Sequence, residues 1–154
     1  MNEEKVILER HKPIDFIVNY NNKRVVWRGS KGKMIDRKEV SRDLFDFLAM
    51  STRAISDGAL VISNKSENKK EILDELVDRE AYENNALTKE EAIKLLRGKF
   101  EVMKNSFDKV TSIDTKTFIY EVAKEIKLES AKKQKYIKEM LGSELSTEEL
   151  FDEE

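Results

Sequence analysis

Hydrophobic and polar residues alternate in the first third of the chain with the two-residue period of β-strands. IDFIVNY, residues 14–20, carries an apolar residue at every second position. RVVWR, residues 24–28, is rich in the β-branched and aromatic side chains that favour strands. Asn21-Asn22 tolerate the left-handed backbone of a two-residue turn, so the two segments predict a β-hairpin.

A third strand is predicted directly after this hairpin. GSKG, residues 29–32, is a turn signal, and KMIDRKEV, residues 33–40, follows it with Met34 or Ile35 as the apolar anchor. Residues 14–40 are therefore predicted to form a three-stranded antiparallel meander.

One helix is predicted to pack on this small sheet. Ser41 is a good N-cap, and Asp43 places a negative charge in the first turn. The apolar positions of one helical face are Leu44, Phe47, Leu48 and Ile55. We expect the helix to end before Asp57-Gly58, and ALVIS, residues 59–63, to form a short further strand.

The rest of the chain has the periodicity of helices. NKSENKK, residues 64–70, contains no apolar residue and predicts a linker. The helix signals beyond it are apolar positions 72–76, a Thr88–Glu91 capping box with a stripe over 92–107, apolar positions 118–126, a stripe ending at Gly142, and a short terminal helix after Ser146.

These patterns predict an α+β protein with a small antiparallel β-meander and one packed helix, followed by a helical subdomain. The predicted divisions are residues 1–64 for the sheet and its helix, 65–142 for the helical subdomain, and 143–154 for an acidic C-terminal tail.

Charge is abundant and unevenly distributed along the 154 residues. Charged residues make up 39% of the chain, with 29 basic against 31 acidic. Eight cations and two acids lie between Lys23 and Arg42, whereas six acids and no base follow from Glu144 onward. The near-balance predicts a soluble protein without a global attraction to nucleic acid.

Composition also excludes several kinds of chemistry. The chain has no cysteine, which excludes disulfides, thiolate catalysis and cysteine-ligated metals. No apolar stretch is long enough to span a membrane, and the charged N-terminus lacks a signal-peptide core. We expect a cytoplasmic protein without membrane contact.

The stretch KRVVWRGSKGKM, residues 23–34, is the most basic candidate site. It does not fit a phosphate-binding P-loop, because Trp27 replaces the first glycine and Met34 replaces the magnesium-binding hydroxyl. Cations beside an exposed Trp27 suit nucleic acid, but lysines also protect a solvated sheet edge. If Trp27 faces the helix instead, the stacking platform is lost. The interaction candidates here are Arg24, Trp27, Arg28, Lys31 and Lys33.

No catalytic, cofactor or metal site is predicted. His11 is the only histidine, and its polar surroundings predict a surface position. The paired carboxylates lie among lysines on faces predicted to be solvated, and no calcium-loop pattern is present.

The acidic tail, SELSTEELFDEE, admits two interpretations. It is either a solvated chain end or a short amphipathic motif that uses Leu150 and Phe151 to anchor a partner.

Two segments resemble small bacteriophage proteins in style. The first is NNKRVVWRGSKGKMIDRKEVSRDLFDFL, in which a polar hairpin leads through a glycine turn to a KEV strand and a helix. The second is LTKEEAIKLLRGKFEVMKNSFDKV with EVAKEIKLESAKKQKYIKEMLG. The resemblance covers residues 14–63 and 87–142, carries no catalytic residues, and implies a virion or assembly component rather than an enzyme.

The sequence therefore predicts a non-enzymatic interaction or structural protein, and the resemblance implies a phage virion or assembly accessory subunit. Its expected partners are other proteins, including further copies of itself or virion proteins, and its expected location is the cytoplasm or the virion. The alternative is a nucleic-acid-binding regulator that uses the basic segment 23–42.

Overall fold

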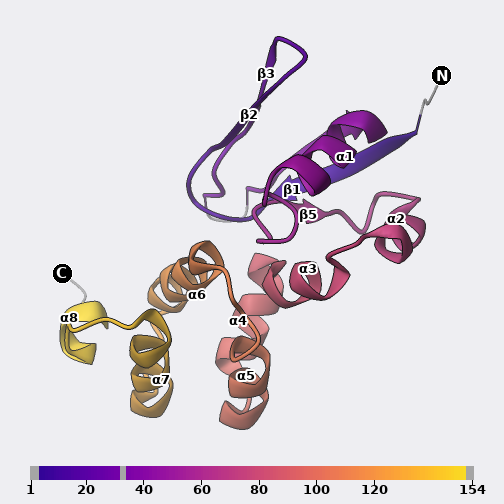
Figure 1. The fold of residues 1–154 in the computed structure, drawn as a ribbon. Coiled ribbons are helices and arrows are strands. Elements are labelled where there is room, and N and C mark those ends of the chain that lie inside the picture. The colour runs from indigo at the N-terminus through magenta and orange to yellow at the C-terminus, as the bar shows by residue number, and fades with distance from the viewer. Residues whose placement is uncertain (1–3, 32–33, 152–154) are drawn as a thin grey trace. The chain divides into compact units, whose positions relative to one another are not determined.

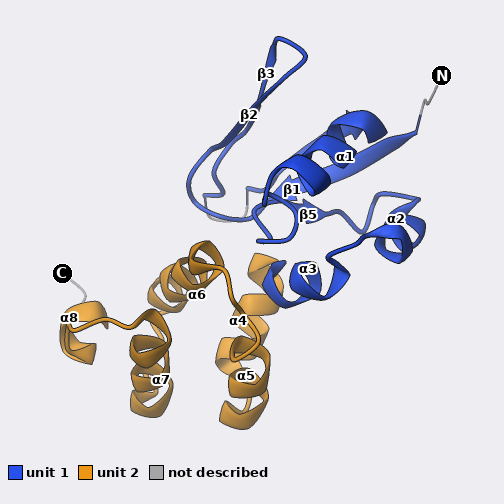
Figure 2. Cartoon of the chain, in the orientation of Figure 1, with its two compact units in different colours: residues 1–87 blue, residues 88–154 orange. Residues whose placement is uncertain are grey.

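The computed structural model describes residues 4–31 and 34–151, which form antiparallel strands and helices. The predicted α+β class is confirmed. The chain divides into two compact units, residues 1–87 and 88–154, shown in blue and orange in Figure 2. Each unit is described by itself below.

The first unit is built on a three-stranded antiparallel sheet with the order β4-β1-β5. The central strand is β1 (Lys5–Arg10), flanked by β4 (Asp36–Ser41) and β5 (Val61–Ile62). Val6 pairs with Val40, and Leu8 pairs with both Lys38 and Ile62. Val6 and Leu8 are fully buried, so the two apolar side chains on one face of β1 anchor the core.

A separate two-stranded hairpin follows β1. Strands β2 (Phe16–Tyr20) and β3 (Lys23–Trp27) pair across a turn in which Asn21 and Asn22 have φ of 51° and 63°. Positive φ at both central residues is the signature of a type I′ turn, so the predicted hairpin is confirmed. Figure 1 shows the hairpin extending as an arm of the first unit.

The pairing predicted for the third strand is wrong. The strand exists as β4, but its partner is β1 rather than β3. The sequence pattern missed β1 because only three apolar residues, Val6 to Leu8, interrupt an otherwise charged segment. A central strand covers its apolar face with long-range contacts, which local alternation does not reveal.

Helix α1 (Arg42–Ser51) packs its buried residues, including Leu44, Phe45 and Leu48, into the same core. Ser41 is its N-cap as predicted, because the Ser41 hydroxyl accepts a hydrogen bond from the Leu44 N–H. The helix ends at Ser51, earlier than predicted. Thr52 closes it with a hydrogen bond from its hydroxyl to the Leu48 carbonyl.

The predicted linker at 64–70 is instead fastened to β1. The Ser66 hydroxyl accepts a hydrogen bond from the Ile7 N–H at 3.2 Å. The Asn68 amide donates to the Lys5 carbonyl at 2.9 Å. The polar side chains of this segment form hydrogen bonds with backbone groups of β1. Its polar composition therefore does not mark a division between units.

Two further helices belong to the first unit, which moves the division from the predicted 64/65 to 87/88. They are α2 (Lys69–Glu75) and α3 (Arg79–Asn85). The Tyr82 hydroxyl accepts a hydrogen bond from the Ile62 N–H at 2.8 Å, which ties α3 to β5. Ile72 and Tyr82 are buried in the same core as the sheet.

Arg42 joins three elements of this unit through ion pairs. Its guanidinium contacts carboxylates of Glu4 before β1, Asp46 on α1 and Glu75 on α2, at 2.7–2.9 Å. Burial lowers the pKa of Arg42, but the three carboxylates outweigh that effect and raise it above the ordinary value. The charge of Arg42 is therefore fixed, and α2 is held to the sheet by it.

The second unit is helical and comprises α4 (Lys89–Arg97), α5 (Phe100–Phe107), α6 (Ile113–Glu125), α7 (Ala131–Leu141) and α8 (Thr147–Phe151). The predicted capping box of Thr88 and Glu91 is confirmed. The predicted continuous stripe over 92–107 is divided at Gly98, which ends α4 in extended backbone. The Lys133 ammonium donates to the Leu96 and Gly98 carbonyls, which satisfies the end of α4.

Gly142 ends α7 with φ of 68°, in agreement with the predicted C-terminal glycine signal. None of the helices in the described ranges is long and apolar enough to cross a membrane.

Candidate interaction surface

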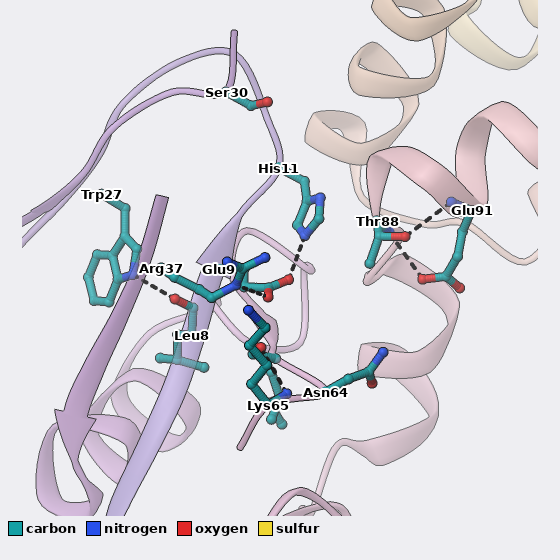
Figure 3. A network of polar contacts seen from close by, with 12 residues as sticks. Leu8, Glu9, His11, Trp27, Ser30, Arg37, Asn64, Lys65, Thr88 and Glu91 are labelled. Atoms are coloured by element: carbon teal, nitrogen blue, oxygen red, sulfur yellow. Dashed lines mark hydrogen bonds and ion pairs between the residues drawn. The ribbon is translucent and has the colours of Figure 1, made fainter. Parts of the chain in front are cut away.

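The inner face of the hairpin is part of the core. Trp27 has no exposed surface, and its ring lies 5.9 Å from that of Phe16. Its indole N–H donates to the Leu8 carbonyl at 3.1 Å, as Figure 3 shows. Tyr20 packs 5.0 Å from Phe47 on α1. The Trp27 ring is therefore enclosed and presents no face on which a base could stack.

The outer face of the hairpin consists of the opposite side chains. The register pairs Ile17 with Val26 and Asn19 with Arg24, so these four residues share one face. Ile17 is 46% exposed, and Arg24 is also exposed. We call this face, with Arg28 at the end of β3, the hairpin outer face. It combines an apolar centre with two cations.

No acidic residue lies within the hairpin or the turn after it. From Phe16 to Ile35 the sequence has five Lys or Arg and no Asp or Glu. Lys31 is exposed next to the hairpin. Lys33 lies outside the described residues. The structure thus exposes Arg24, Arg28 and Lys31 and buries Trp27.

The base of the hairpin is fixed by hydrogen bonds to its neighbours. The Gly29 N–H donates to the Asp15 carboxylate at 2.6 Å, and the Arg28 N–H donates to the Asp36 carboxylate at 2.7 Å. A Cβ on Gly29 would lie 2.0 Å from the Pro13 carbonyl oxygen, so only glycine fits this crossing. The outer face is therefore carried by a defined arm rather than by a loose loop.

The two tail residues singled out from the sequence are used inside the second unit. Leu150 is 6% exposed, and its carbonyl accepts a hydrogen bond from the Tyr120 hydroxyl at 2.6 Å. The Phe151 ring lies 5.5 Å from the Tyr120 ring. Both residues thus hold α8 against α6. Residues 152–154 lie outside the described part of the chain.

Comparison with known proteins identifies both units. Residues 4–78 match the YonA N-terminal domain, and residues 88–147 match the YonA C-terminal domain. The two matches follow one another and together cover most of the chain. The chain belongs to the YonA family. The gap between the two domains contains the structural division at 87/88, so family and fold divide the chain in the same place.

The YonA name is of a prophage type, and it agrees with the resemblance to phage proteins at the level of a phage-associated protein. No curated protein and no solved structure matches the chain significantly.

The YonA N-terminal domain also contains a charged cluster that sequence reasoning missed. Glu9 is 7% exposed, and its carboxylate contacts Arg37 and His11, the latter at 2.8 Å (Figure 3). The predicted surface position of His11 is wrong, because this residue is only 9% exposed. His11 follows directly on β1, so the missed strand also explains the missed histidine.

The surroundings of Glu9 determine its charge. Burial raises the pKa of this carboxyl, but hydrogen bonds from Arg37 and His11 outweigh burial, so the pKa lies below its ordinary value of 4.5. The side chain is acceptor-only when ionised, and it satisfies donors from β4 and from the end of β1. Within the described ranges, no group of three His, Asp or Glu side chains is placed to hold a metal ion.

Replacing Glu9 by glutamine should reduce the acid sensitivity of the fold. A lowered pKa in the folded state stabilises the protein above pH 4.5, and this contribution is lost as the pH falls below that value. At pH 7 we expect Glu9→Gln to cost about 1.5–3 kcal/mol, the usual range for a hydrogen bond to a charged group. Urea unfolding at pH 7 and at pH 3.5 measures the effect. A destabilisation of equal size at both pH values would contradict the assigned role.

Proposed function

We propose that this YonA-family chain is a non-enzymatic interaction subunit of a phage, and that the hairpin outer face is its contact surface for another phage protein. The observation that supports this most is the exposed Ile17 between Arg24 and Arg28, on an arm fixed at its base. An exposed apolar centre with a charged rim is the usual composition of a protein interface.

The rest of the first unit supports a role in binding rather than chemistry. Among the described residues, buried charged groups of this unit have partners that hold elements together, as Glu9 does with Arg37 and Arg10 does with the Ala59 carbonyl. A scaffold of this kind that exposes one cationic arm suits an accessory subunit whose function depends on recognition. Opposite charge on the partner would steer the encounter and fix its orientation.

Charge reversal on the arm tests the proposal. The double variant Arg24→Glu/Arg28→Glu changes two exposed outer-face cations. The matched control Arg53→Glu/Lys70→Glu makes the same charge change at two exposed sites of the same unit. Each affinity-tagged variant is expressed during phage production, and the proteins that co-purify are quantified by mass spectrometry.

The proposal predicts that one phage protein is recovered with the parent chain and the control, and falls at least about tenfold with Arg24→Glu/Arg28→Glu. Recovery that is equal for all three chains would contradict the hairpin as the contact surface. Circular dichroism of the purified variants verifies that their fold is unchanged.

A nucleic-acid-binding regulator is the second candidate function. The run from Phe16 to Ile35, five cations without an acid, favours it. Enclosure of Trp27 argues against single-strand stacking, because the ring has no exposed surface. Fluorescence anisotropy with labelled DNA at two salt concentrations separates the candidates. Contact with about four phosphates would give a slope of log K against log salt of roughly −3 to −4. Absence of binding at low salt would exclude this candidate.

A further inference from the structure

Strand β3 has an outer edge at which backbone groups point away from the hairpin. The two-residue turn makes Tyr20 and Lys23 the hydrogen-bonded pair that closes the hairpin. Hydrogen-bonded and non-hydrogen-bonded pairs alternate along antiparallel strands. Arg24 and Val26 therefore belong to non-hydrogen-bonded pairs, and the N–H and C=O of each point outward from β3.

The same edge already donates a hydrogen bond to a carboxylate where it approaches β4. Arg28 is the next residue with an outward N–H, and that N–H donates to the Asp36 carboxylate at 2.7 Å. The carboxylate occupies the place that a backbone carbonyl of a neighbouring strand would take. Hydrogen bonds from the rest of the described chain do not reach the outward groups of Arg24 and Val26. Two outward positions thus remain open beside one that is capped by an acid.

Charge on this edge selects the partner. The Arg24 and Arg28 side chains lie on the same face as Val26, so a strand placed along β3 passes both cations. A second copy of β3 in antiparallel orientation, with Val26 opposite Val26, would place Arg24 opposite Arg28, which is destabilising. The chain's own acidic tail is engaged in the second unit through Leu150 and Phe151. An acidic segment from a different protein fits the edge best.

We propose that the β3 edge binds an acidic, extended segment of a partner protein as a third strand of the hairpin. This inference rests on the proposed function, because it names the partner chemistry of the same contact surface. The incoming backbone pairs with the N–H and C=O of Arg24 and Val26. Its Glu or Asp side chains lie against Arg24 and Arg28, and an apolar side chain between them covers Val26.

A labelled model peptide tests the binding mode on the full chain. The probe is the fluorescein-labelled heptapeptide Thr-Glu-Thr-Val-Thr-Glu-Thr, in which Glu, Val and Glu share one face of the extended strand, and its charge control has Lys in place of both Glu. Binding is measured by fluorescence anisotropy, and the bound residues are located by amide chemical shifts in NMR. We expect the acidic peptide to bind and to shift the amides of Arg24 and Val26, and the lysine peptide to show no binding.

Two proline variants separate the two edges of the hairpin. Val26→Pro removes an outward N–H from β3, and Ile17→Pro removes the equivalent outward N–H from β2. Neither change breaks a hydrogen bond within the hairpin, and edge positions of this kind tolerate proline. We expect Val26→Pro to weaken peptide binding at least about tenfold and Ile17→Pro to weaken it less than about twofold.

A peptide with N-methyl groups along one edge gives the same test without altering the protein. Methylation of the edge that faces β3 should abolish binding, and methylation of the opposite edge should not. No binding of the acidic peptide at 1 mM, taken as an order-of-magnitude limit for a specific contact, would overturn the inference. Equal effects of Val26→Pro and Ile17→Pro would overturn it as well.

The outcomes also separate this inference from the proposed function. If Arg24→Glu/Arg28→Glu weakens peptide and protein binding while Val26→Pro changes neither, the contact surface stands and strand addition is overturned. If the peptide binds at the β3 edge but the amount of co-purified phage protein is unchanged by Arg24→Glu/Arg28→Glu, the proposed function fails instead. A dimer in analytical ultracentrifugation that Val26→Pro converts to a monomer would assign the edge to a second copy and overturn the acidic partner.

Discussion

Replacing Trp27 by alanine is expected to lower the free energy of unfolding of the first unit by about 3–5 kcal/mol, the range for large-to-small changes of a buried tryptophan. Trp27 has no exposed surface and packs against Phe16. Its indole N–H also satisfies the Leu8 carbonyl on the central strand. Alanine would leave a cavity where the hairpin meets the sheet. Urea unfolding followed by circular dichroism measures the loss.

Trp27→Phe is the matched variant for the hydrogen bond. It keeps an aromatic ring and removes the donor to Leu8, so a smaller loss of about 1–3 kcal/mol is expected. Trp27 is also the only tryptophan, so the tryptophan fluorescence of the parent protein reports on this site alone. Its emission should be blue-shifted and poorly quenched by acrylamide. An emission spectrum typical of a solvent-exposed tryptophan would contradict the enclosed hairpin face. An alanine variant as stable as the parent would contradict it as well.

Gly58→Ala is the second change with a large expected effect, at about 2–5 kcal/mol from backbone strain and overpacking together. Gly58 has φ of 70°, and a Cβ there would lie 2.2 Å from the Asn85 carbonyl oxygen. The contact closes the end of α3 against the segment before β5. Because both groups belong to the backbone, neither can move without displacing α3. Thermal unfolding measured by circular dichroism gives the size of the effect.

Gly142→Ala controls for backbone conformation alone. Gly142 has nearly the same φ, 68°, but nothing lies within 4 Å of a Cβ placed there. Its expected cost is about 1–2 kcal/mol, which is the left-handed penalty by itself. Equal costs for the two alanine variants would mean that the close approach of Gly58 to Asn85 does not contribute to stability. A larger cost at Gly58 assigns α3 to the first unit energetically.

Local signals predicted the elements whose geometry is set by a few neighbouring residues. Asn21-Asn22 gave the type I′ turn, and Ser41 and the Thr88–Glu91 box gave the helix starts. In each of these cases the side chain or backbone that decides the structure lies within three residues of the element. Contacts of this kind can be predicted from a short segment of sequence, because both partners lie within it.

Elements decided by distant contacts were missed or misassigned. Strand β1 has only three consecutive apolar residues in a charged segment, and its burial depends on β4, β5 and α1. The segment 64–70 reads as a linker because its polar side chains bind β1 rather than solvent. The division at 87/88 follows from Tyr82 and Gly58, whose partners lie more than 19 residues away. No local pattern encodes these pairings.

The candidate site was predicted in part for the same reason. Alternation along the hairpin allowed Trp27 to face the helix, and the structure places Arg24 on the opposite face. The outcome depended on whether an element packed against the inner face, and α1 does so through Phe47. The acidic tail showed the same limitation, since the position of Leu150 depends on Tyr120 of another helix.

Site-specific photocrosslinking tests the central claim most directly. A photoreactive amino acid replaces Ile17 on the hairpin outer face, and in a matched chain it replaces Val77, an exposed apolar residue of the same unit that is 92% accessible. Irradiation during phage production should link position 17, but not position 77, to one phage protein through an acidic, extended segment. Crosslinks from position 17 only to nucleic acid, or equal crosslinking from both positions, would contradict the hairpin as a protein contact surface.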